Sequence, residues 1–172
     1  SKVRHKLMVK DRPQPFQSAK IRKAIDLAID KEALIAQVMG GNRIPATHLV
    51  HEGFAKEGFS YAEGSSFDPE KARALLASAG YPGGKGFPNI ELVYNTYETH
   101  KVIAEYVQRQ LKENLGISIS IGNMEWKSLL NKMHSHEFYI SRSSWCVDYP
   151  DPLSFLEVFT SGHENNYGSY EN

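Results

Sequence analysis

The chain has 172 residues, 41% of them hydrophobic, which is enough to bury the core of one domain or one compact lobe. Lys and Arg total 20 and Asp and Glu total 20, so the formal net charge is +0, and no overall charge favours binding to nucleic acid or to an anionic membrane. The single cysteine, Cys146, excludes an internal disulfide and a cysteine-based zinc cluster. No apolar run in the sequence is long enough to span a bilayer.

The first part of the chain predicts a short strand and two helices. The strand is the apolar stretch within residues 4–10, which a segment rich in proline ends. Ser18 is suited to cap a helix, because apolar residues recur at helical spacing between 21 and 28. Asp30 is suited to cap a second helix, and the glycine pair at 40–41 ends it.

A stretch without periodicity separates these helices from the next one. Residues from about Asn42 to Ser66 are rich in Gly, Glu and aromatic residues, and long stretches of this kind inside a compact domain are often functional or form an interface. The next helix has clearer boundaries. Asp68 is expected to cap it, Pro69 occupies its first position, and Gly80 is placed to close it in a left-handed conformation.

The second half of the chain alternates between strands and helices. The expected elements are a strand at 90–94, a helix at about 98–115, a strand at 117–121, a helix at about 126–134, a strand that begins at 138–140 and a helix at 153–159. Successive units of strand, helix and strand predict an α/β fold with a parallel sheet and right-handed crossovers. Ile and Ser alternate strictly from Ile117 to Ile121, so this strand has a polar face and is expected near a sheet edge.

Three features that could suggest metal binding or catalysis lack the pattern that such sites need. The histidine pairs at 48/51 and 134/136 belong to no recognisable ligand set, and exposed loop histidines are the favoured interpretation. The glycine-rich run at 83–86 lacks the spacing and the following helix of a phosphate-binding loop. Cys146 has no obvious base near it in the sequence, although folding can bring one close. We therefore predict no metal, no cofactor and no catalytic residue.

The densest group of polar and aromatic side chains lies between Arg142 and Pro152. This stretch joins the end of a predicted strand to the start of a predicted helix, where open α/β sheets place their ligands. It holds a guanidinium, an indole, a thiol, carboxylates and a phenol. The pattern alone favours two interpretations equally. One is a ligand site; the other is a core indole at Trp145 with Asp148 or Asp151 as the cap of the next helix.

At these residues the sequence resembles the oligopeptide- and dipeptide-binding proteins of ABC importers, family 5 of the extracytoplasmic solute-binding proteins. The resemblance covers essentially the whole chain. Its motifs, in family order, are Pro15-Phe16, Ile21 to Ile25, Ala28 to Glu32, Asp68 to Ala72, Leu75-Leu76, Ala79 to Tyr81, Tyr94 to Thr96, His100-Lys101, Asn114 to Ile117, Glu125-Trp126 and Trp145 to Tyr149. It implies a lobe of the periplasmic-binding-protein type II class, in which helices flank a small mixed or parallel sheet.

Members of this family are much longer, usually have three lobes, and enclose a peptide between the first and the third. The resemblance implies that residues 1–172 form most of the third lobe, without the first lobe and the final returning segment. It also implies a receptor that captures short peptides and delivers them to the membrane permease of the importer. Such a receptor is extracytoplasmic, either periplasmic or lipid-anchored, and this fragment of it is expected to be monomeric and to present half a binding site.

The resemblance also assigns roles to individual residues. Asp148 becomes the partner of the ligand's α-ammonium group, a pairing that forms strong charge-assisted hydrogen bonds. The segment 144–146 would offer backbone donors and acceptors to an extended peptide. Arg142, and His100 depending on pH, would neutralise the C-terminus of the peptide. The ligand-binding residues implied in this way are Asn95, His100, Trp126, Arg142, Ser144, Trp145, Cys146 and Asp148.

Two of these residues concern a side-chain pocket. Trp126 matches an aromatic wall of that pocket and Asn95 a polar position near it. Judged from residue type alone, a core indole and a strand-end turn are about equally favoured. The chain also departs from the family pattern. Met133 stands where a polar or charged residue is expected, and Lys10-Asp11 replaces the usual aromatic and Asn ending of the opening strand.

Three other functions remain open from the sequence. Related receptors of the same architecture carry nickel, haem or sugar, in which case Asp148 would have no ammonium partner. A hydrolase would pair Cys146 with a histidine. A surface adhesin or interaction module would use the stretch from about Asn42 to Ser66 to meet a protein partner.

Overall fold

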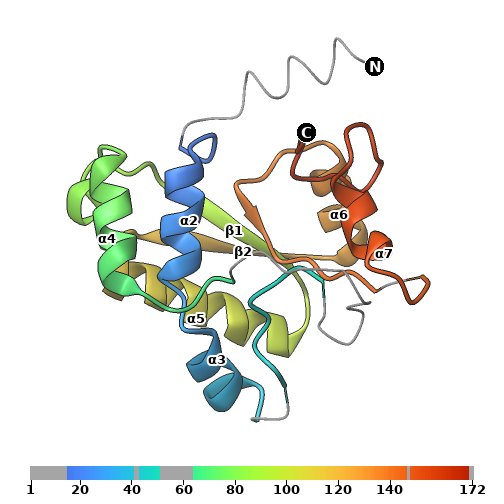
Figure 1. The fold of residues 1–172 in the computed structure, drawn as a ribbon, viewed down its shortest axis with the longest axis horizontal. Coiled ribbons are helices and arrows are strands. Elements are labelled where there is room, and N and C mark those ends of the chain that lie inside the picture. The colour runs from blue at the N-terminus through green and yellow to red at the C-terminus, as the bar shows by residue number, and fades with distance from the viewer. Residues whose placement is uncertain (1–14, 41–42, 51–63, 147, 171–172) are drawn as a thin grey trace.

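The computed structural model describes most of the chain as an α/β fold in which helices surround a small central sheet (Figure 1). The described residues are 15–40, 43–50, 64–146 and 148–170. Within them the sheet is parallel and has the order β2-β1-β3. Its strands are β1 (Ile90–Asn95), β2 (Ile119–Met124) and β3 (Ile140–Ser141). The predicted fold class and parallel pairing are thus confirmed, and the strand expected within residues 4–10 lies outside the described residues.

The helices agree closely with those that the sequence predicts. Among the described residues they are α2 (Ala19–Leu27), α3 (Lys31–Val38), α4 (Pro69–Ser78), α5 (Glu98–Leu115), α6 (Trp126–His134) and α7 (Leu153–Leu156), together with the 3-10 turns η2 (Pro82–Gly84) and η3 (Glu157–Phe159). The helix expected at 153–159 is therefore divided. After α7 the chain tightens to hydrogen bonds between residues three apart, such as that from the Thr160 N–H to the Glu157 carbonyl. No helix in the described part of the chain is both long and apolar enough to cross a membrane.

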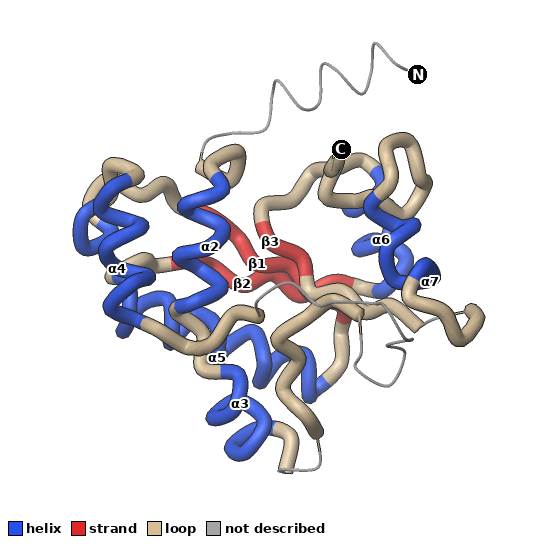
Figure 2. The backbone as a smooth tube through the Cα atoms, in the orientation of Figure 1, coloured by secondary structure: helices blue, strands red, loops and turns tan. Residues whose placement is uncertain are grey.

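The central strand β1 has a hydrophobic cluster on each of its faces, because successive side chains of a strand point to opposite sides. Ile90, Leu92 and Tyr94 belong to the larger cluster, together with residues from α2, α4 and α5. Val93 belongs to the smaller cluster, which α6 completes. Figure 2 shows the strands between α2 and α4 on one side and α6 and α7 on the other. Helices therefore cover both faces of the sheet, so a ligand could approach the sheet at the ends of its strands.

Strand β2 begins two residues later than the alternation predicts. Ile117 is buried, but its N–H donates to the carbonyl of Leu111 in the preceding helix, so it belongs to the end of α5 rather than to the sheet. Gly116 makes this change of direction in a left-handed conformation, with φ +71°. The edge position predicted for the strand is confirmed, because among the described strands β2 pairs with β1 alone.

Two of the three predicted helix caps are confirmed. The Asp30 carboxylate accepts a hydrogen bond from the Ala33 N–H, and the Asp68 carboxylate accepts one from the Lys71 N–H, both at 2.9 Å. Ser18 occupies the N-cap position of α2, but its side chain makes no capping hydrogen bond. The cap predicted at Ser18 is therefore wrong in its chemistry, since residue type at the right position does not determine where the hydroxyl points.

This difference between the caps leads to a test of stability. Asp68→Ala removes a capping hydrogen bond and is expected to lower the free energy of unfolding by about 1 kcal/mol. Ser18→Ala removes a hydroxyl that caps nothing and is expected to change it by less than about half as much. Urea denaturation of the two variants beside the unchanged chain measures both. Equal losses in the two variants would contradict the assignment of the caps.

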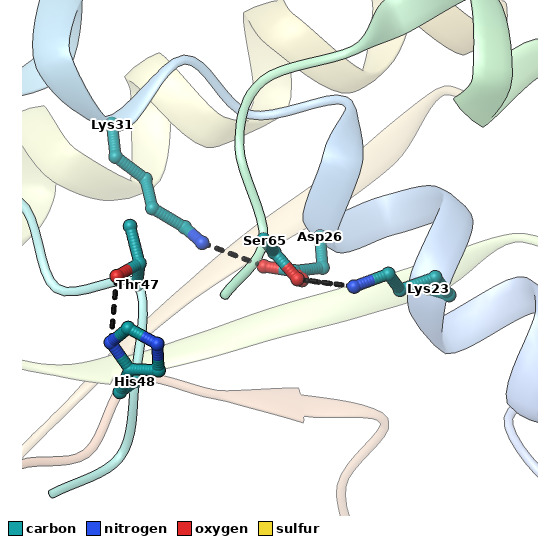
Figure 3. Close-up of polar contacts among 6 residues, drawn as sticks. All are labelled: Lys23, Asp26, Lys31, Thr47, His48 and Ser65. Atoms are coloured by element: carbon teal, nitrogen blue, oxygen red, sulfur yellow. Dashed lines mark hydrogen bonds and ion pairs between the residues drawn. The ribbon is translucent and has the colours of Figure 1, made fainter. Parts of the chain in front are cut away.

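The aperiodic stretch is held against α2 where the structure describes it (Figure 3). The Lys23 ammonium donates to the Ser65 hydroxyl, and the Lys31 ammonium donates to the Asp26 carboxylate at 2.8 Å. Burial would raise the pKa of Asp26, but hydrogen bonds from Lys31 and Ser65 and the two lysine charges hold it below its ordinary value. Residues 43–50 and 64–66 contain no helix or strand, as predicted, and the remaining residues of this stretch lie outside the described part.

Candidate ligand-binding site

The eight residues predicted to bind a ligand lie at or just beyond the carboxyl ends of the three strands. Asn95 ends β1, and His100 follows it in the first turn of α5. Trp126 opens α6 directly after β2, and the segment from Arg142 to Asp148 follows β3. Because the strands are parallel, their carboxyl ends share one edge of the sheet, which is where open α/β sheets bind ligands. The fold thus brings segments that are far apart in the sequence to this common edge.

Backbone hydrogen bonds fix the chain where it leaves the sheet. The Thr96 N–H donates to the Met124 carbonyl at 2.8 Å, and the Thr96 hydroxyl hydrogen-bonds to the side chain of Asn123. On the other side of β1, the Arg142 N–H donates to the Val93 carbonyl at 2.8 Å. The segments that follow the three strands therefore start from positions that are fixed relative to one another. Sequence reasoning did not identify Thr96 or Asn123 in this role.

Asn95, His100 and Arg142 form a polar cluster at the end of β1. Asn95 Oδ1 and His100 Nδ1 are both buried and have no hydrogen-bond partner among the described residues, which is uncommon for buried polar atoms. The guanidinium of Arg142 lies close enough to act on the charge of His100, and its Nη1 is 3.5 Å from the Ser144 hydroxyl. Burial lowers the pKa of Arg142, although an arginine remains a cation in proteins. The cluster therefore combines a fixed positive charge with polar atoms that a ligand could satisfy.

The protonation state of His100 follows from this environment. Burial lowers its pKa, the neighbouring charge of Arg142 lowers it further, and a hydrogen bond to the backbone of Asn95 opposes them in part. The net pKa lies below the ordinary value of 6.5, so His100 is neutral at pH 7 without a ligand. The sequence predicts that the charge of His100 depends on pH. In the structure its lowered pKa means that a more acidic solution is needed to protonate it.

The lowered pKa predicts a pH effect on stability. The unfolded chain takes up a proton at His100 near pH 6.5, whereas the folded chain resists protonation until a lower pH. This residue therefore costs stability progressively as the pH falls from 6.5 through the folded pKa. Denaturant unfolding at pH 8 and pH 5 is expected to show a smaller loss for His100→Gln than for the unchanged chain, with Arg142→Gln between them. Identical losses in all three would contradict the placement of His100 beside Arg142.

The segment after β3 shows which parts of the structural interpretation hold. Trp145 is 38% exposed, so it is not a core residue, and its indole N–H donates to the Ser154 carbonyl at 2.8 Å. Pro152 is the N-cap of α7, and the Asp151 carboxylate just before it accepts from the Leu153 N–H at 3.0 Å. The Asp148 side chain is exposed, and its carboxylate makes no hydrogen bond or ion pair with any described residue. Asp148 is therefore left available to a ligand.

Trp126 and Met133 lie on α6 with opposite environments. Trp126 is 45% exposed, which excludes a core indole, and the Glu125 carboxylate caps the helix beside it by accepting from the Lys127 N–H at 2.8 Å. Met133 is fully buried against Val93 in the smaller cluster. Met133 therefore contributes to the core rather than to the polar strand ends. Its departure from the family pattern gives no information about which ligand side chain is preferred.

The features considered for metal binding and thiol chemistry do not assemble into a site in the described part of the chain. No group of three or more His, Cys, Asp or Glu residues there could hold a metal ion. His48 hydrogen-bonds to the Thr47 hydroxyl, and the ring of His134 packs edge-on against Tyr167. Cys146 is exposed, and no described histidine is hydrogen-bonded to it.

The fold is that of the periplasmic solute-binding proteins. The model of the bacterial extracellular solute-binding proteins, family 5 (middle), matches residues 4–167. The chain belongs to this family, and the resemblance noted in the sequence is confirmed.

Known relatives match the chain almost from end to end. It is 36% identical to the dipeptide-binding protein DppE of Bacillus subtilis, over 92% of this chain and 30% of that protein. It is 35% identical, with the same two coverages, to the probable deoxycholate-binding periplasmic protein YgiS of Escherichia coli. The crystal structure of the periplasmic oligopeptide-binding protein OppAIV of Borrelia burgdorferi superposes with a TM-score of 0.82 at 36% identity, over 94% of this chain and 32% of that one. The chain therefore spans about a third of the length of these relatives.

Proposed function

We propose that this chain is one lobe of a receptor that captures short peptides outside the cytoplasm and delivers them to the permease of an ABC importer. Relatives named as dipeptide- and oligopeptide-binding proteins match nearly the whole chain and support this proposal. Residues 1–172 would be most of the third lobe of a longer protein, consistent with the third of the relatives' length that they span. The lobe itself is monomeric, and its role is binding rather than catalysis.

The carboxyl edge of the sheet would hold both ends of the peptide. The free carboxylate of Asp148 pairs with the α-ammonium group of the ligand, and water is excluded when a second lobe closes over it. Backbone groups of residues 144–146, all exposed, pair with the extended peptide and do not depend on its side chains. Arg142 supplies the fixed charge for the ligand's carboxylate, and His100 joins it by taking up a proton when that anion arrives.

The observation that carries this proposal is the pair of unsatisfied polar atoms beside Arg142. In the described part of the chain neither Asn95 Oδ1 nor His100 Nδ1 has a hydrogen-bond partner, although both atoms are buried. Leaving such groups unpaired costs on the order of 1–3 kcal/mol each, so a native site of this kind is completed by a ligand or by water. A peptide brings the N–H groups and the carboxylate that such a cluster requires.

A non-peptide organic acid is the second candidate ligand, because a relative at 35% identity is named as a probable deoxycholate-binding protein. Such a ligand has a carboxylate for Arg142 and His100 but no ammonium group for Asp148. The nickel, haem and sugar ligands that the family resemblance left open differ in the same respect. The presence or absence of a free amino group on the ligand therefore separates the two candidates.

Calorimetry of the full-length receptor tests the proposal. A pool of mixed tripeptides and tetrapeptides is titrated into the receptor beside the same pool after N-acetylation, which removes the α-ammonium charge. Binding that acetylation abolishes supports peptide capture through Asp148. Binding that is indifferent to acetylation, or tight binding of deoxycholate with no binding of either pool, would replace peptides with an organic acid as the ligand.

A further inference from the structure

Ser154 is the polar residue of α7, and its side chain is completely buried, with 0% exposure. Neither its residue type nor its position in the sequence predicts a role. It is hydrogen-bonded to Trp145, Asp148 and Asp151, and the carboxylate of Asp148 has no partner among the described residues. A fully buried hydroxyl in a short surface helix needs a hydrogen-bond partner, because water cannot reach it. Its partners show what it does.

Three groups of Ser154 make hydrogen bonds, and each reaches a different point of this segment. Its carbonyl accepts from the Trp145 indole N–H at 2.8 Å. Its hydroxyl accepts from the Asp148 backbone N–H at 3.2 Å. Its own N–H donates to the Asp151 carbonyl at 3.1 Å. One buried residue therefore makes hydrogen bonds to every third residue of the segment, at positions 145, 148 and 151.

The tie to Asp148 matters most, because the carboxylate of that residue has no other support among the described residues. The position of the carboxylate therefore depends on its backbone, and within the described part the side-chain contact to that backbone comes from the Ser154 hydroxyl. Preorganisation of this kind improves binding, since an acceptor that is already in place loses less conformational freedom when the ligand arrives.

We propose that Ser154 is a positioning residue: its buried hydroxyl holds the backbone of Asp148 so that the carboxylate meets the α-ammonium group of the ligand. This inference rests on the proposed function, because it assumes a ligand with a free amino group. Ser154 itself does not touch the ligand. It acts through Asp148, and it holds the Trp145 indole by a backbone contact that side-chain substitution leaves in place.

The test uses the ratio of the Kd of N-acetylated trialanine to that of free trialanine, measured by calorimetry on the full-length receptor. Ser154→Ala removes the acceptor for the Asp148 N–H and is expected to lower this ratio about three- to tenfold, the effect of one hydrogen bond. Ser154→Thr keeps the hydroxyl and is expected to restore the ratio. A purely structural role would weaken both ligands alike and leave the ratio unchanged.

Val158→Ala is the matched control. Val158 is buried in η3, only four residues away, and its truncation loosens the same part of the chain without removing an acceptor from Asp148. It is expected to lower the Tm and to leave the ratio unchanged. If Ser154→Ala does not fold, Ser154→Cys replaces it, because a thiol of similar size accepts hydrogen bonds only weakly.

The outcomes separate this inference from the proposed function. A large ratio in the unchanged receptor that falls in Ser154→Ala and returns in Ser154→Thr supports both. A large ratio that Ser154→Ala leaves unchanged overturns the role of Ser154 and leaves peptide capture intact. A ratio near one in the unchanged receptor overturns the proposed function, and the inference with it.

Discussion

Replacing Asp148 with asparagine in the full-length receptor is expected to weaken the binding of trialanine by about 2 to 5 kcal/mol, the cost of removing one partner from a buried charge pair. This corresponds to a loss of affinity between about thirtyfold and several thousandfold. The effect is large because closure of the receptor would leave the ligand's ammonium group away from water and without its counter-charge. Calorimetry gives the loss directly.

Asp151→Asn is the control for this prediction. Asp151 is an acidic residue of the same segment, but its carboxylate accepts from the Leu153 N–H at the start of α7. The amide oxygen of asparagine can accept the same hydrogen bond, so we expect this variant to bind trialanine within a few-fold of the unchanged receptor. Losses of equal size in the two variants would indicate a general effect of acidic charge. Binding by Asp148→Asn within a few-fold of the unchanged receptor would discard Asp148 as the ammonium partner.

Replacing Gly116 with alanine is expected to give a large loss of stability. Gly116 has φ +71°, and a Cβ added there would lie 2.3 Å from the backbone carbonyl oxygen of Gly83. Forcing an alanine into the left-handed region costs roughly 1–2 kcal/mol, and the displacement of η2 adds about 1–3 kcal/mol. The expected loss in the free energy of unfolding is therefore about 2–5 kcal/mol, measured by urea denaturation.

Gly86→Ala separates the two contributions. Gly86 has nearly the same conformation, with φ +76°, but no atom lies within 4 Å of the position of an added Cβ. This variant meets only the backbone strain, and we expect it to lose about 1–2 kcal/mol. A loss in Gly116→Ala no greater than that in Gly86→Ala would contradict the close contact between η2 and the end of α5.

The helices could be predicted from the sequence because their signals are local. Apolar spacing and the capping residues Asp30 and Asp68 act within a single helix, so the positions of α2, α3, α4, α5 and α6 follow from neighbouring residues. The location of the site could also be predicted in outline, since parallel strands must end at a common edge. Ile117 shows where such reasoning fails. Its place in an alternating pattern predicts a strand, but its N–H donates to the Leu111 carbonyl at the end of α5.

Features of the site that depend on tertiary contacts could not be predicted. A serine in a short helix carries no sign that its hydroxyl is buried and holds Asp148, as Ser154 does. The unsatisfied atoms of Asn95 and His100 are likewise evident only once the fold has removed them from water. Met133 departs from the family pattern in the sequence, and its place beside Val93 in the smaller cluster follows from the packing of α6 on the sheet. Each of these depends on residues that are distant in the chain.

A crystal structure of the full-length receptor with bound trialanine tests the central claim most directly. We expect the peptide to lie along the carboxyl edge of the sheet, with its α-ammonium nitrogen about 2.7–2.9 Å from a carboxylate oxygen of Asp148, the distance of a charge-assisted hydrogen bond. A peptide bound elsewhere on the receptor, or one at this edge whose ammonium group is turned away from Asp148, would contradict the claim.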